Sequence, residues 1–200
     1  MKDLKLILAS TSPYRKELLE RLGIPFVTEK PLFDEESHKS STPDARPIEV
    51  CRELAMGKAA SLKDLYPDAW VIGSDQALDL DGKMLGKKPD FESALAQLLK
   101  LNGKAHHLIT SVCLYKFNER PIEFQNISTI TLKNNSKELL ERYLQLDAPY
   151  DCAGCYKMES HGMALVQDIQ CSDSTSIMGL PLIELGRKLE KLGFDLLQNS

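Results

Sequence analysis

Leu4-Lys-Leu-Ile-Leu-Ala-Ser-Thr-Ser-Pro-Tyr-Arg-Lys16 is the stretch that decides the fold class. Its first half is a short apolar run, which predicts a buried strand over residues 4–9. Ser12 followed by Pro13 predicts the start of a helix, because serine caps helix N-termini and proline fits the first helical position. The chain therefore passes directly from a strand into a helix, as α/β proteins do.

The rest of the chain continues this alternation. Asp81-Gly82 between two short apolar segments indicates a hairpin with a type I′ turn. The polar stretch 30–47 holds three prolines and predicts a long loop, of the kind that is usually functional. We predict an α/β fold with a mixed sheet. The expected strands are 24–28, 70–75, 77–80, 83–85, 107–117, 123–132 and 163–166, and the expected helices are 13–23, 48–62, 91–101, 136–146 and 181–193.

Length and charge narrow the class of protein. Two hundred residues make one α/β domain or two closely packed lobes. The formal net charge of -4 argues against an extended nucleic-acid surface, which needs a basic stripe. The N-terminal apolar run is too short for a signal peptide, and no stretch approaches the roughly 20 apolar residues that span a bilayer. We therefore expect a cytoplasmic protein that binds neither nucleic acid nor membrane.

The five cysteines predict free thiols. They are odd in number and scattered, so a disulfide framework is not expected. Cys152 and Cys155 have the spacing of a redox or zinc motif, but His106-His107 is not the second ligand pair that zinc requires. The pair is interpreted as two ordinary buried or partly buried thiols.

A candidate anion site lies in the opening stretch. Ser10, Ser12, Arg15 and Lys16 surround the point where the strand passes into the helix. Free backbone N–H groups and the helix dipole favour an anion there, and the hydroxyls and cations add hydrogen bonds and charge. The spacing indicates a triphosphate cradle about as well as it indicates a capped helix with solvated cations.

A carboxylate ends the strand over 70–75. Asp75 follows an apolar run at the strand's carboxyl end, where α/β enzymes commonly place catalytic groups. It could bind a divalent cation and take a proton from an attacking water. It could also simply cap a turn, which the local pattern slightly favours.

Scattered acids and lysines complete the candidate set. Acids suit magnesium or manganese and lysines suit polyphosphate oxygens, but each residue alone is more typical of a solvated surface charge. Lys58 differs because it falls among apolar residues of a predicted helix, where its stem could also lie along the apolar face. The set is Asp34, Glu35, Lys58, Lys87 and Lys88.

Several short motifs follow one another in a fixed order. They are Leu6-Ile-Leu-Ala-Ser-Thr-Ser-Pro-Tyr-Arg15, Asp34-Glu35, Ala55-Met-Gly-Lys58-Ala59, Ile72-Gly-Ser-Asp75-Gln76, Leu85-Gly-Lys87, Ala153-Gly154 with Lys157, and Gly179-Leu-Pro-Leu182. Together they resemble the Maf-like nucleotide pyrophosphatases over nearly the whole chain. The opening motif is the most specific of them.

This resemblance implies an activity and an architecture. The activity is cleavage of a nucleoside triphosphate between its α- and β-phosphates, assisted by a divalent cation such as Mg2+, Mn2+ or Co2+. The architecture is a single Maf-like domain over 1–200, similar to inosine triphosphatases. In it an elongated mixed sheet with flanking helices forms two lobes around a central cleft, and a homodimer is common.

The resemblance also assigns roles to single residues. Asp75 matches the proton acceptor and, with Glu35, the metal ligands. Lys16 stands where a second arginine is usual, which removes bidentate phosphate binding there. Gly86-Lys87-Lys88-Pro89 replaces a Gly-Lys-Pro motif, so the choice of lysine stays open, with Lys87 favoured. The residues matching the substrate pocket are Ser10, Tyr14, Arg15, Lys16, Lys58, Gln76, Lys87, Lys157 and Glu159.

Tyr14, Gln76 and Glu159 stand where the family divides by base, and they match the 7-methyl-GTP subgroup most closely. A carboxylate such as Glu159 can accept from the N1–H and N2–H2 edge of guanine, which uracil and thymine do not offer. A 7-methylated base is cationic, so stacking on Tyr14 gains cation–π attraction. Gln76 can donate and accept. Tryptophan is more usual at the Tyr14 position, and a dTTP/UTP pyrophosphatase is the alternative.

Two hypotheses come from other classes of protein. A nucleotide-binding regulator of cell division would hydrolyse nothing of importance, and it would have no need for an acid placed like Asp75. A thiol redox protein would use Cys152 and Cys155, and it would lose function on Cys155→Ser.

Overall fold

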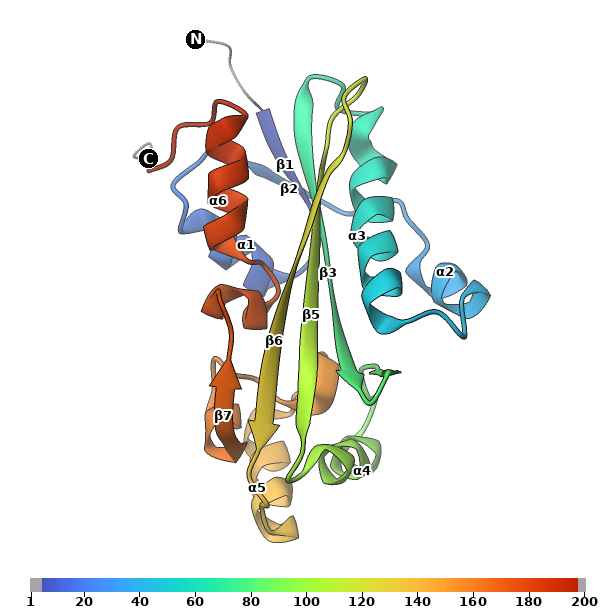
Figure 1. Ribbon diagram of the computed structural model, residues 1–200, viewed down its shortest axis with the longest axis vertical. Coiled ribbons are helices and arrows are strands. Elements are labelled where there is room, and N and C mark those ends of the chain that lie inside the picture. Colours follow the sequence, from blue (N-terminus) through green and yellow to red (C-terminus); the bar gives the residue numbers. More distant parts are fainter. Residues whose placement is uncertain (1–4, 198–200) are drawn as a thin grey trace. The chain divides into compact units, whose positions relative to one another are not determined.

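The computed structural model describes residues 5–197, so residues 1–4 and 198–200 of the predicted domain lie outside the described part. The chain divides into two compact units (Figure 1). Unit 1 is Met1–Asp75, Thr110–Asn126 and Asp173–Ser200, and unit 2 is Gln76–Ile109 and Ile127–Ser172. The single Maf-like domain stays a prediction.

Seven strands form a mixed sheet in the order β2-β1-β3-β5-β6-β7, with β4 paired to β3. β1 runs parallel to β2 and β3, whereas β4 and β7 run antiparallel to their partners. The α/β class and the mixed sheet are confirmed. The strands are β1 (Lys5–Ala9), β2 (Val27–Glu29), β3 (Ala69–Leu80), β4 (Lys83–Leu85), β5 (Ala105–Tyr115), β6 (Ile122–Leu132) and β7 (Val166–Gln170).

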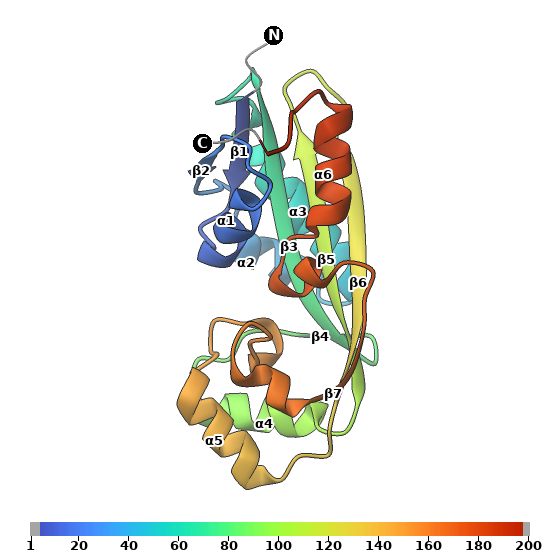
Figure 2. The same ribbon diagram turned by 90° about the vertical axis from the view of Figure 1, so that its left-hand side faces the viewer.

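Unit 1 has helices on both faces of its part of the sheet (Figures 1 and 2). Leu6 and Leu8 of β1 pack in one apolar cluster with side chains of α1 and α6, while Ile7 and Ala9 pack in another with side chains of α3. Because successive side chains of a strand point to opposite faces, this run is buried on both sides. The helices are α1 (Pro13–Glu20), α2 (Glu35–Ser41), α3 (Pro47–Lys63) and α6 (Leu182–Lys191), with the 3-10 turn η3 (Ser174–Met178).

The predicted passage from β1 into α1 is confirmed. Ser12 Oγ accepts from the Arg15 backbone N–H at 3.4 Å, and Pro13 occupies the first helical position. The helix ends at Glu20, earlier than predicted, and Gly23 (φ 61) lies in the turn that follows.

Unit 2 consists of short elements around the remaining parts of β3, β5 and β6. Asp81 and Gly82 both have positive φ, 53 and 79, as the predicted type I′ turn between β3 and β4 requires. The buried side chains include Leu78, Leu98 and Ile130. The helical elements are α4 (Phe91–Leu101), α5 (Lys137–Asp147), η1 (Ala153–Cys155) and η2 (His161–Leu165).

Three expectations about local structure are wrong. The predicted strands 70–75 and 77–80 form one continuous strand, β3, so Asp75 lies within the strand and not at its carboxyl end. An apolar run that passes through small and acidic residues shows no break in the sequence where the predicted end was placed.

The stretch 30–47 is not all loop, because α2 forms within it behind the cap Asp34. No residue of α2 is buried, so the sequence of this helix lacks the apolar periodicity that would have predicted it. Residues 161–165 form η2 and not a strand, and β7 begins at Val166. A short apolar run does not reveal its conformation by periodicity alone.

All five cysteines are free. No helix within residues 5–197 is long and apolar enough to cross a membrane.

Candidate active site

An ion cluster lies between α3, β3 and α2 in unit 1. Lys58 Nζ lies 2.7 Å from Asp75 Oδ1 and 3.1 Å from Glu35 Oε2. It also donates to the Ser74 carbonyl at 3.3 Å. Lys58 is 4% exposed and Asp75 is 8% exposed, so this lysine does not carry its ammonium into water. Two carboxylates face one ammonium, which leaves a negative charge that favours a further cation.

Close packing of α3 on β3 brings Lys58 to Asp75. A Cβ on Gly73 would lie 2.1 Å from the Ala55 carbonyl oxygen and 2.6 Å from the Ala59 nitrogen. Only glycine lets the helix backbone approach the strand this closely. Asp75 lies two residues further along the strand and points to the same face. Lys58 follows Ala55 by three residues on the same side of the helix.

A buried thiol supports the backbone of Asp75. Cys51 Sγ donates to the Asp75 carbonyl oxygen at 3.3 Å. Burial raises the pKa of Cys51 to about 12, so the thiol stays protonated and remains a donor. The role of Cys51 could have been suspected from the sequence, because residues 51, 55 and 58 lie on one side of α3 at helical spacing.

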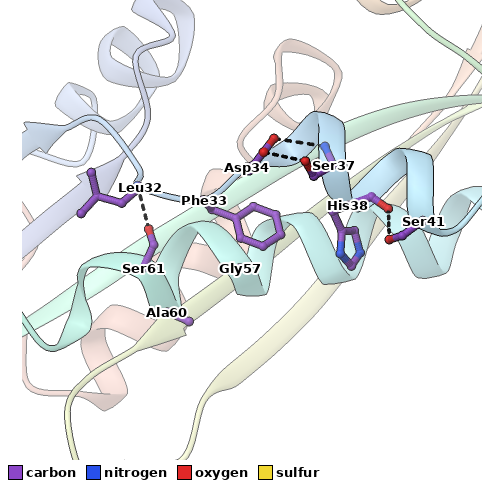
Figure 3. A pocket seen from close by; sticks show the side chains of 9 residues that line it. All are labelled: Leu32, Phe33, Asp34, Ser37, His38, Ser41, Gly57, Ala60 and Ser61. Carbon is purple, nitrogen blue, oxygen red and sulfur yellow. Dashed lines mark hydrogen bonds between the residues drawn. The ribbon is translucent and has the colours of Figure 1, made fainter.

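The segment before α2 is attached to α3 (Figure 3). Glu35 follows this segment directly as the first residue of α2, and it contacts Lys58. The Leu32 N–H donates to Ser61 Oγ at 3.1 Å. The Phe33 ring lies directly over Gly57, where a Cβ would come within 2.5 Å of it. His38 Nε2 lies 2.9 Å from Glu53 Oε2 on α3.

An open pocket of about 640 Å³ lies along this attachment (Figure 3). One candidate acid of the sequence analysis, Asp34, is among the residues that line it. The lining residues are Leu32, Phe33, Asp34, Ser37, His38, Ser41, Gly57, Ala60 and Ser61.

A second cluster lies on the opposite face of the sheet in unit 1. Arg15 Nε and Ser74 Oγ both donate to the Gly179 carbonyl oxygen, each at 3.0 Å. Gly179 has a φ of 105 at the end of η3, a conformation that favours glycine. The bond fixes Arg15 through one of its five N–H donors. Ser74 and Gly179 were absent from the predicted site, although strand alternation places Ser74 opposite Asp75.

The other predicted residues of unit 1 all come from the β1–α1 passage. Ser10 is buried, and its Oγ accepts from the Ser12 N–H at 3.1 Å. Tyr14 is half-buried. Lys16 is exposed on α1, where its Nζ lies 3.7 Å from Glu20 Oε1.

In unit 2, Gln97 fixes the turn that precedes the two lysines. Its Nε2 donates to the Gly86 carbonyl at 3.0 Å and lies 3.3 Å from Cys155 Sγ. Gln97 is 3% exposed and therefore rigidly held by α4. Lys87 is exposed and Lys88 is half-buried.

Lys157 and Glu159 lie on one tight loop of unit 2. The Gly162 N–H donates to the Lys157 carbonyl at 3.0 Å, and a Cβ at Gly162 would lie 2.3 Å from that oxygen. Lys157 Nζ lies 3.2 Å from Asp151 Oδ1, while Glu159 is exposed. Gln76 follows Asp75 on β3, half-buried, as the first residue of unit 2.

The thiols of Cys152 and Cys155 are not activated. Burial raises the pKa of Cys152 to about 12 and raises the pKa of Cys155 as well. A redox thiol needs the opposite shift, because the thiolate is the reactive form. These environments therefore do not favour the redox hypothesis.

The carboxylates fit a magnesium-type ion better than zinc. In the described part of the chain, no group of three His, Cys, Asp or Glu residues could hold a metal by itself. Mg2+ is usually bound by one or two carboxylates together with substrate phosphates and water. Glu35 and Asp75, both in contact with Lys58, supply such a pair of carboxylates.

Two known proteins are similar to this chain over nearly its whole length. The protein named 7-methyl-GTP pyrophosphatase from Bdellovibrio bacteriovorus is 45% identical over 190 residues, which are 95% of this chain and 98% of that protein. A protein of the same name from Xanthomonas axonopodis pv. citri is 40% identical over 192 residues, 96% of this chain and 98% of that one.

A solved structure has a similar fold. The Staphylococcus aureus Ham1 protein superimposes with a TM-score of 0.52 at 12% identity, covering 93% of this chain and 99% of that one. The family model described as Maf-like protein matches residues 5–192, which confirms the resemblance seen in the motifs. The chain belongs to the Maf-like protein family.

Proposed function

We propose that this protein hydrolyses 7-methyl-GTP to 7-methyl-GMP and diphosphate with the help of a divalent cation. The observation that carries the proposal is the cluster of buried Lys58 and Asp75 with half-buried Glu35 in a member of this family. The names of the similar Bdellovibrio and Xanthomonas proteins support the choice of substrate.

The cations of the site bind the triphosphate. Arg15, fixed through Nε, and Ser10 act at the N-terminus of α1, where helix dipole and backbone N–H groups favour phosphate. Lys58, Lys87 and Lys157 neutralise the charge that develops on the leaving diphosphate. Lys16 adds charge from α1, without the paired hydrogen bonds that an arginine would give.

Asp75 carries the proton transfer. It orients a water molecule and accepts its proton while the water oxygen attacks the α-phosphorus. The bond between this phosphorus and the oxygen bridging to the β-phosphate breaks, and diphosphate leaves. Cys51 and Lys58 hold Asp75 in place through its backbone carbonyl and its carboxylate.

Glu35 and Asp75 would hold the divalent cation, Mg2+, Mn2+ or Co2+. Such a cation, when bound, offsets phosphate charge and lowers the pKa of coordinated water.

The base is read by three residues. Glu159 accepts from the Watson–Crick edge of guanine, the ring of Tyr14 stacks on the cationic methylated base, and Gln76 adds a hydrogen bond. The role that we infer is removal of modified nucleotides before they enter RNA. The five free thiols are typical of a reducing compartment, which supports a location in the cytoplasm. We also propose that the protein forms a homodimer.

The test is diphosphate release from a panel of nucleoside triphosphates, with the wild type beside Asp75→Asn. We expect 7-methyl-GTP to be the best substrate. Asp75→Asn should lower kcat at least about a thousandfold, because it removes the carboxylate that accepts the proton of the attacking water. Binding of 7-methyl-GTP to Asp75→Asn by calorimetry is the control for folding. Turnover of dTTP or UTP instead would overturn the base assignment, and binding without turnover by the wild type would favour the regulator.

A further inference from the structure

A buried carboxylate that the proposed mechanism does not use ends α5. The side chain of Asp147 is 2% exposed, although it is the last residue of its helix. The C-terminus of a helix carries partial negative charge, so a buried anion is unfavourable there unless strong donors surround it. Asp147 must therefore be stabilised by specific partners.

The partners lie in or next to the loop over residues 157–162, which is beside α5 in unit 2 (Figure 2). Asp147 Oδ1 accepts from Ser160 Oγ at 3.0 Å, and Oδ2 accepts from the His161 backbone N–H at 3.1 Å. The His161 ring nitrogen Nδ1 lies 2.5 Å from Oδ1. Hydrogen bonds from His161 and Ser160 hold the pKa of Asp147 below its usual value, against the effect of burial.

A second arm of the same network reaches the start of the loop. Tyr143 lies one helical turn before Asp147, and burial together with the nearby Asp147 carboxylate raises the pKa of its hydroxyl, which therefore stays protonated. The Tyr143 hydroxyl oxygen in turn accepts from the Lys157 backbone N–H at 2.8 Å. Asp147 is thus connected to the residues on both sides of Glu159, while Glu159 itself stays exposed.

We propose that Asp147, through Tyr143 on one side and Ser160 and His161 on the other, is the positioning residue that sets base selectivity by fixing Glu159. This inference rests on the proposed function, in which Glu159 reads the base. A carboxylate on a free loop would accept equally from many partners, because rigid placement is what makes a hydrogen bond discriminate. The phosphate chemistry at Asp75 does not need this network.

The test compares Asp147→Asn with the wild type on 7-methyl-GTP and UTP, which share the triphosphate and differ in the base. An asparagine amide has the same shape but turns one acceptor into a donor facing the loop. We expect the ratio of kcat/KM for 7-methyl-GTP over UTP to fall by about tenfold or more, the size of one lost charged hydrogen bond. Turnover of UTP should change far less.

Tyr143→Phe is the second variant, since it keeps the packing and removes only the hydroxyl group, which accepts from the Lys157 N–H and lies near the Asp147 carboxylate. It should lower the same ratio, and amide exchange of residues 157–162 should accelerate in both variants. Asp168→Asn, which changes an exposed carboxylate on β7 that accepts from Gln170, is the matched control and should do neither.

An unchanged ratio in both Asp147→Asn and Tyr143→Phe would overturn the inference, as would an equal fall for both substrates. A wild type without turnover of any nucleotide refutes the proposed function instead. In that case faster amide exchange in Asp147→Asn would show that Asp147 holds the loop, but the role in base selectivity would be refuted together with the proposed function.

Discussion

Lys58 combines a structural role with the phosphate-binding role proposed for it. Its ammonium is buried and held by two carboxylates and a carbonyl. Burying the Lys58 ammonium and the Asp75 carboxylate costs desolvation free energy, which their mutual attraction offsets. The position therefore tolerates neither loss of the charge nor loss of its partners.

Lys58→Met tests this balance. Removing the ammonium leaves Asp75 buried without its cation, so we expect the free energy of unfolding to fall by roughly 3 kcal/mol or more. Urea denaturation followed by the fluorescence of Trp70, the single tryptophan, measures this in unit 1. Lys63→Met on the same helix is the control.

Lys63 pairs with exposed Asp64 at 2.8 Å, and a surface pair of this kind contributes less than about 1 kcal/mol. Equal stability of the two lysine variants would contradict the account of Lys58.

At the scale of single residues, the sequence predicted best where a motif was specific. Lys58, Asp75 and Glu35 were all proposed from motifs, and the structure brings them together. Gly179 stood in a motif but received no role, and Cys51 and Asp147 were not proposed at all, because the contacts of these residues join segments that are separated in the chain. No local pattern encodes such a contact, and each became visible only with the packing.

At the scale of elements, α2 and the segment before it act as one arm that carries Glu35. The arm has no buried residue in its helix, and Phe33 over Gly57 is its main apolar contact with α3. The position of Glu35 therefore depends on the absence of a side chain at Gly57.

Gly57→Ala should displace the arm without unfolding α3. The new methyl group would meet the Phe33 ring at 2.5 Å, and a ring at the end of a side chain can move. We expect the Mg2+ concentration for half-maximal activity to rise about tenfold, because Glu35 moves with the ring. The free energy of unfolding should change by less than about 1 kcal/mol, since alanine favours the helix.

Titration of activity against Mg2+ for wild type, Gly57→Ala and Ala60→Ser provides the measurement. Ala60 is the matched position, because it lines the same pocket on the same helix (Figure 3). An unchanged Mg2+ requirement in Gly57→Ala would show that the arm does not position Glu35.

The elements themselves were predicted unevenly. The helices α3, α4 and α5 have strong apolar periods, and their bounds match the predictions to within about two residues. The hairpin was predicted correctly from Asp81-Gly82, because both residues tolerate the positive φ values that its turn requires. The helix α2 and the turn η2 were missed, because polar caps and 3-10 geometry leave no period in the sequence.

For the molecule as a whole, stability should fall in mild acid through His106. Its ring is 1% exposed and lies 2.7 Å from the Tyr156 hydroxyl. Burial lowers the pKa of His106 from 6.5 to about 4. The unfolded chain therefore takes up this proton first as the pH falls, which favours unfolding between about pH 6.5 and 4.

Urea unfolding by circular dichroism at pH 7 and pH 5 measures this contribution. From pH 7 to pH 5 the wild type should lose about 2 kcal/mol more than His106→Gln, which has no proton to gain at this position. Equal losses in the two proteins would mean that His106 is protonated in the folded state.

Gly73 has a consequence for genetics. Its position admits no larger side chain, because the backbone of α3 fills the space that a methyl group would need. A screen for null alleles should therefore recover substitutions at Gly73 as often as at Asp75, although this residue presents only a hydrogen atom to its neighbours. Complete intolerance of substitution would then identify Gly73, where α3 packs against β3, as well as Asp75, for which catalysis is proposed.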